Sequence, residues 1–121
     1  MDEKLKQVVR SLHEKTWSGK LAWDDISSLS GGDEYRVKLG NSIIEVRSGY
    51  RDDYEDAGAA IPATRYHRML VLNSKGFVVD ECDQTPADDD FQLLGSLVEA
   101  ARGNARKRED TLDQLLRLLA K

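Results

Sequence analysis

The first apolar positions of the chain recur at the spacing of an α-helix. They fall at i, i+3, i+4 and i+7 and so share one stripe of a 3.6-residue turn: Leu5, Val8, Val9 and Leu12. Asp2 and Glu3 precede the stripe, where carboxylates suit the positive end of the helix dipole. The pattern stops near Trp17, and Gly19 can adopt the left-handed conformation that commonly ends a helix. The spacing predicts an N-terminal amphipathic helix.

Apolar and charged residues alternate on both sides of Gly40-Asn41, which predicts a β-hairpin. A two-residue Gly-Asn connection suits a primed turn and fixes the register, so that paired residue numbers sum to 81. The pairs are Leu39 with Ser42, Val37 with Ile44 and Tyr35 with Val46 on one side, and Arg36 with Glu45 and Glu34 with Arg47 on the other. A slip by one residue would turn the charges toward the core.

A second hairpin is predicted from the β-rich run Tyr66–Leu72, a turn at Asn73–Gly76 and the return strand Phe77–Val79. Both runs contain consecutive apolar residues, so we expect them to form the central strands, covered on both faces. The segment between the hairpins, residues 49–63, has no periodicity. It is long for a connection within one domain, and such loops are often functional or mobile.

The C-terminal third predicts helices. Thr85 is the expected N-cap, with Pro86 at the first helical position. One apolar stripe follows: Phe91, Leu94, Val98 and Ala101, with Leu97 beside it. Gly103-Asn104 either ends this helix or lies within a longer one, and a last stripe carries Leu112, Leu115, Leu116 and Leu119. We predict an α+β fold: a four-stranded antiparallel meander with one N-terminal and two C-terminal helices packed on one face.

Composition limits the class of protein. The 121 residues are expected to form a single domain over 1–121, with 33% charged side chains and a net charge of −4. No apolar run approaches the length of a membrane span, and the N-terminus lacks the apolar stretch of a signal peptide. Cys82 is the single cysteine. An internal disulfide is therefore excluded, and a cytoplasmic location is expected.

Carboxylates are plentiful in residues 49–90, which hold four basic and ten acidic side chains. Calcium needs six to eight converging oxygens, and the EF-hand spacing is absent. Zinc would have to use His13, His67 and Cys82, whereas a structural site takes four ligands. We expect no metal and no cofactor, and interpret the acids as solvated loop and helix-terminal charges.

The sequence also contains no strong catalytic motif. His67 and Cys82 fall on strands that can be neighbours, but the acids around Cys82 disfavour a thiolate. There is no nucleophile elbow and no glycine-rich phosphate loop, since Gly31-Gly32 precedes a strand. We expect no catalytic residue. One alternative stays open: a small-molecule or divalent-metal-dependent enzyme with its site on the polar side of the sheet, beside Tyr66 and Arg68.

The basic residues cluster near the C-terminus, at Arg102, Arg106, Lys107 and Arg108. Four cations neutralise too few phosphates to hold nucleic acid at physiological salt, and the net charge opposes such binding. A nucleic-acid accessory protein is therefore the weaker second alternative.

Short motifs resemble a family of small, functionally uncharacterised bacterial α+β proteins. They are Thr16-x-x-Gly19-Lys20-Leu21-x-Trp23, Leu72-Asn73-x-x-Gly76 and Ala100-Ala101-Arg102. The resemblance implies a bacterial cytosolic domain and assigns no catalytic residue.

The remaining hypothesis is a non-enzymatic protein-interaction or regulatory module that binds a protein partner or self-associates, as in a homodimer. Tyrosine gives large contact area at low entropic cost, and charge steers an encounter. The predicted protein-binding residues lie in and beside the acidic loop: Tyr50, Asp52, Asp53, Tyr54 and Ile61. An open sheet edge is a second surface that could pair with another strand. Trp17 and Trp23 are both expected to pack in the core.

Overall fold

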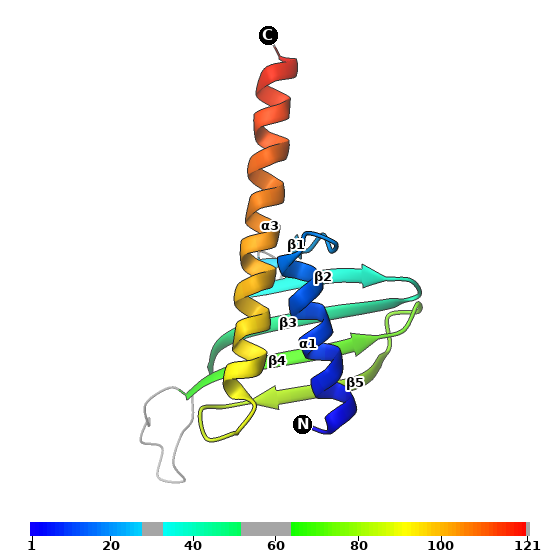
Figure 1. Cartoon of the computed structure of the whole chain (residues 1–121), viewed down its shortest axis with the longest axis vertical. Helices are drawn as coiled ribbons and strands as arrows, with labels where there is room; N and C mark the ends of the chain where they lie inside the picture. Colours follow the sequence, from blue (N-terminus) through cyan, green and yellow to red (C-terminus); the bar gives the residue numbers. More distant parts are fainter. Residues whose placement is uncertain (28–32, 52–63, 121) are drawn as a thin grey trace.

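The computed structural model describes residues 1–27, 33–51 and 64–120. Two helices, α1 (Glu3–Trp17) and α3 (Phe91–Leu119), lie on one face of an antiparallel sheet (Figure 1). The sheet has five strands that neighbour one another in chain order: β1 (Asp24–Asp25), β2 (Asp33–Leu39), β3 (Ser42–Arg51), β4 (Thr64–Leu72) and β5 (Val78–Gln84). The α+β class and the meander are confirmed. The prediction of four strands is wrong by one, because the two-residue strand β1 pairs with β2.

Helix α1 has the predicted ends. Asp2 is its N-cap, and its Oδ1 accepts a hydrogen bond from the Leu5 amide at 2.8 Å. At the other end Gly19 has a φ of 77°, and the Lys20 amide donates to the Lys15 carbonyl at 2.9 Å. This is the hydrogen-bond pattern of a Schellman motif, in which a left-handed glycine lets the chain turn back toward the helix.

The hairpin of β2 and β3 has the predicted register. Tyr35 pairs with Val46 and Val37 with Ile44, and all four side chains are buried beneath the helices. Gly40 has a φ of 57°, while no non-glycine residue among those described has a positive φ. Positive φ at the first central position alone is typical of a type II′ turn.

The second hairpin is present, and β4 lies inside the sheet between β3 and β5, but the predicted central position of the return strand is wrong. Strand β5 is an edge strand that pairs with β4 only. Phe77, Val78 and Val79 are 66%, 51% and 61% exposed, because the return strand begins where it has a neighbour on one side alone. The preceding connection is also shorter than predicted, since β3 extends to Arg51 and pairs with β4 there.

The C-terminal region forms one helix of 29 residues, which corrects the prediction of two. The helix does not end at Gly103-Asn104, because the residues around this pair pack against the rest of the protein. Ala101 and Ala105 are buried, and the Asn104 side chain bonds both the Trp23 amide and the Leu21 carbonyl. These contacts outweigh the cost of about 1 kcal/mol for an interior glycine.

The start of α3 lies later than predicted. Asp88 Oδ2 accepts from the Thr85 amide at 2.7 Å, as in a capping box, but the residues up to Asp90 form turns. The helix begins at Phe91, whose ring stacks on the buried His67 of β4 with centroids 4.4 Å apart.

The core lies between the sheet and the two helices. Its largest fully buried side chains come from the segment before β1, from the strands and from the helices: Trp23, Tyr35, Met69, Leu94, Leu97, Val9, Val46 and Val98. Core packing of Trp23 is confirmed. The same prediction for Trp17 is wrong, because Trp17 is the last residue of α1 and its side chain is 75% exposed.

Candidate functional site

Of the five predicted protein-binding residues, Tyr50 is the one that the structure describes. Tyr50 lies on β3 opposite Arg65, and its side chain is 71% exposed. Asp52, Asp53, Tyr54 and Ile61 lie outside the described residues. The structure therefore describes one of the five predicted residues.

His67 and Cys82 lie on adjacent strands but are not cross-strand partners. His67 opposes Gln84 and Cys82 opposes Met69. Burial raises the pKa of the Cys82 thiol, and Gln84 Nε2 donates to its sulfur at 3.2 Å. A raised pKa keeps the thiol protonated, which does not favour nucleophilic chemistry.

The open face of the sheet carries paired charges. Arg68 bonds Asp83 through two nitrogens, at 2.6 and 3.3 Å, and its guanidinium lies 5.6 Å from the Tyr66 ring centroid. Arg36 binds Glu45 in the same way along the hairpin. These cross-strand pairs stabilise the sheet.

The basic cluster is divided between two environments. Arg102 is partly buried and binds Asp33, the Tyr35 hydroxyl and Glu99. Arg106 and Lys107 are exposed, and the side chain of Arg108 lies outside what the structure describes. Arg102 therefore fastens α3 to β2 and is already engaged within the protein.

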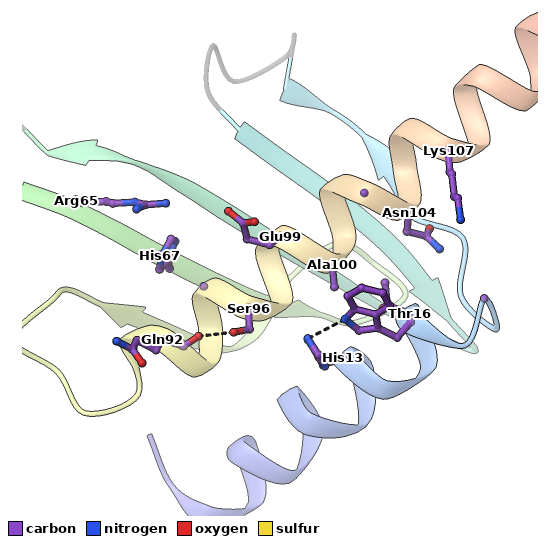
Figure 2. Close-up of a pocket in the computed structure, with 14 residues that line it drawn as sticks. His13, Thr16, Arg65, His67, Gln92, Ser96, Glu99, Ala100, Asn104 and Lys107 are labelled. Carbon is purple, nitrogen blue, oxygen red and sulfur yellow. Dashed lines mark hydrogen bonds between the residues drawn. The ribbon is translucent and has the colours of Figure 1, made fainter.

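A shallow groove of about 830 Å³ crosses the outer face of α3, between α1 and β4 (Figure 2). Small residues of α3, among them Ser96, Ala100 and Gly103, form its floor. Trp17 stands at its α1 side, where its Nε1 donates to His13 Nε2 at 3.2 Å (Figure 2). His67 lines the opposite side, and its Nδ1 is buried without a hydrogen-bond partner among the described residues.

The most exposed apolar surface is the end of α3. Among the α3 side chains that the structure describes, Ala105 is the last buried one, and the helix then continues past the sheet edge formed by β1 and β2 (Figure 1). We call residues 106–119 the α3 tail. At 1.5 Å per residue the tail is about 20 Å long. Its leucines are 48–80% exposed: Leu112, Leu115, Leu116, Leu118 and Leu119.

These leucines continue the stripe that faces the core. The buried residues Leu94, Val98, Ala101 and Ala105 are spaced by four, three and four, and Leu112, Leu115 and Leu119 keep the same phase seven residues further on. Apolar residues at alternating three- and four-residue spacing are typical of a helix that packs against another helix. The other side of the tail is polar, with Asp110, Asp113, Gln114 and Arg117.

The sequence identified the stripe but not its environment. A pattern of Leu112, Leu115, Leu116 and Leu119 indicates an amphipathic helix, and we had expected it to cover the sheet. The meander is narrower than α3 is long, so none of the five described strands lies beneath the tail (Figure 1). The heptad phase that the tail shares with the core stripe is the signal that predicts one continuous helix.

The described part of the chain contains no group of three or more His, Cys, Asp or Glu side chains placed to hold a metal ion. Within residues 1–27, 33–51 and 64–120, no helix has the length and apolarity needed to cross a membrane.

Comparisons with protein-family models, with curated proteins and with solved structures found no match for this chain.

Proposed function

We propose that this chain is a protein-interaction module and that the α3 tail is its docking surface. The observation that carries the proposal is the run of five leucines, 48–80% exposed, on a helix that leaves the body of the protein. Contiguous exposed apolar surface with a polar surround marks interaction sites in soluble proteins.

The physical argument concerns the stability of the tail. A helix shorter than about 12–15 residues is marginal in water, and most helices are stabilised by packing of their apolar face. Four turns of α3 have no such packing within the described body. Binding of another helix or an apolar surface to the leucines would supply it.

Three further expectations from the sequence remain predictions: a second contact surface, the cellular location and the origin of the protein. The acidic loop with Tyr50 stays a predicted second contact surface, and its charge suits a basic partner. A cytoplasmic location and a bacterial origin also stay predictions from the sequence.

Photo-crosslinking tests the docking surface. A photoreactive phenylalanine derivative replaces Leu115, on the apolar stripe, or Gln114, on the polar side one residue away. We expect protein adducts in living cells from position 115 and few from position 114. Equal yields at the two positions, or none at either, would contradict the proposal.

A further inference from the structure

We infer that the groove across the outer face of α3 is a binding site for a small organic anion, a flat aromatic group that carries a carboxylate. The tail leucines are not among the residues that line this groove, so the inference is independent of the proposed docking surface. The groove has a volume of about 830 Å³, which is within the range of small-molecule sites in proteins.

The first support is His67, a buried polar side chain with unused hydrogen-bonding capacity. His67 is 3% exposed, and its Nδ1 has no hydrogen-bond partner within the described ranges. Its Nε2 is the atom nearest to Gly95, and a Cβ at that glycine would lie 2.8 Å from it. Both residues line the groove, and Gly95 has no side chain to cover the ring. Nε2 is therefore the nitrogen that a ligand in the groove reaches.

The protonation state of this imidazole favours an oxygen acceptor. Burial, followed by the charge of Arg65, lowers the pKa of His67, so the ring is neutral near pH 7 and carries one N–H. With the proton on Nε2, the ring donates to a carboxylate oxygen in the groove. Nδ1 then keeps a lone pair, and no buried N–H is left unsatisfied.

The second support is the charge of the groove. Arg65 precedes His67 by two residues on β4, so both side chains lie on the same face of the sheet (Figure 2). Lys107 of α3 also lines the groove, and it is exposed, as is Arg65. Glu99 is the one acidic residue among the lining residues, and its carboxylate lies 3.4 Å from Arg102. The excess of basic side chains favours an anionic ligand.

The third support is a surface on which an aromatic ring can lie. Trp17 is 75% exposed at the α1 side, and the hydrogen bond to His13 holds its indole in place. The floor is open, since a Cβ at Gly103 would meet nothing within 4 Å. Aromatic rings pack favourably against an indole. Gly95 and Gly103 are about 12 Å apart along the helix axis at 1.5 Å per residue, which suits two fused rings with a carboxylate on a short chain.

Nuclear magnetic resonance tests the site with naphthylbutanoate as the anion and naphthylbutanamide as its neutral match. Each compound is titrated into the isotope-labelled full chain. We expect naphthylbutanoate to bind with a Kd below about 1 mM and to shift the Trp17 indole and the amides of Gly95 and Gly103. The buried Trp23 indole and the tail leucines should not shift. Naphthylbutanamide should bind about fivefold or more weakly, because it lacks the charge.

Three variants locate the binding. Gly103→Leu fills the open floor with a good helix former and should abolish the shifts. The matched variant Gln114→Leu adds the same side chain to the polar side of α3 outside the groove, and should leave the Kd unchanged. Arg65→Ala should raise the Kd of naphthylbutanoate by about two- to fivefold and leave that of naphthylbutanamide unchanged. Circular dichroism verifies that all three variants fold.

Absence of shifts at the groove up to the solubility limit of naphthylbutanoate would overturn the inference, as would equal affinity for the two compounds. Binding that survives Gly103→Leu, or shifts confined to the tail leucines, would also overturn it. Crosslinking from position 115 does not depend on any of these results, so the proposed function and the groove site can fail separately.

Discussion

Helix α3 packs closely against β4 at Gly95. A Cβ at this position would lie 2.8 Å from His67 Nε2 and 3.1 Å from its Cδ2. The imidazole has little room to yield, because it is buried and stacked on Phe91. We predict that Gly95→Ala destabilises the protein by about 1–3 kcal/mol, measured by urea unfolding, as overpacking of a core does.

Gly103 supplies the matched control for that prediction. It lies in the same helix, but a Cβ there would meet nothing within 4 Å. Alanine has the higher helix propensity, so Gly103→Ala should stabilise the protein by up to about 1 kcal/mol. If both substitutions changed the free energy of unfolding in the same direction, close packing at His67 would not be the cause.

His67 also couples stability to pH. Burial, followed by the charge of Arg65, lowers its pKa from the usual value of about 6.5. The unfolded chain therefore binds the proton more readily, and the free energy of unfolding should fall as the pH decreases below about 6.5. Urea midpoints measured from pH 7.5 to about pH 5 check this. His67→Leu should show a smaller fall, and an unchanged fall would assign the effect to other groups.

At the scale of the elements, a chain of hydrogen bonds joins α1 to the segment before β1. The Trp23 indole donates to Thr16 Oγ1 at 2.8 Å, and this hydroxyl donates to the Leu12 carbonyl at 2.6 Å. Thr16→Val keeps the shape of the side chain but leaves the buried indole N–H without its acceptor. We predict a loss of about 1–3 kcal/mol in the free energy of unfolding.

Thr16→Ser is the control for this network, since it retains the hydroxyl. Thr16→Ser should lower the free energy of unfolding by much less than Thr16→Val does in the same denaturation experiment. A loss of stability for Thr16→Val that is no larger than the loss for Thr16→Ser would contradict a stabilising role of this hydrogen bond.

The elements differ in how far the sequence specifies them. The register of the β2–β3 hairpin was predicted correctly, because its turn, its apolar face and its charge pairs all depend on residues that are close in the sequence. The β4–β5 hairpin was placed wrongly because apolar composition alone cannot distinguish a central strand from an edge. The single helix α3 was missed because Asn104 is held by Leu21 and Trp23, contacts more than 80 residues apart in sequence.

The candidate site, like the elements, could be predicted from the sequence only in part. The leucine stripe was visible in the sequence, but its exposure follows from the width of the sheet relative to the length of α3. The two tryptophans show the same limit for single residues, since both were predicted to pack in the core and only Trp23 does. Trp23 is buried and bonds Thr16 of α1 and Asn104 of α3, whereas Trp17 lies at the end of α1, beside the groove.

For the whole molecule, α3 serves two purposes along one stripe. Its first half holds the sheet and α1 together through Leu94, Leu97 and Val98, which are at most 1% exposed. Its second half has the same periodicity, but its leucines are exposed and no described strand lies beneath them. A substitution in the first half should therefore unfold the domain, while a substitution in the tail should alter association and leave the domain folded.

This division predicts a gradient of hydrogen exchange along one helix. Amides near Leu97 and Ala101 should open only with global unfolding, because their side chains are buried. Amides of the tail should exchange rapidly in the isolated chain, because an unpacked helix of this length is marginal. Exchange measured by mass spectrometry on the purified chain checks both parts. Tail amides as strongly protected as those near Leu97 would mean that the tail is stable without a partner.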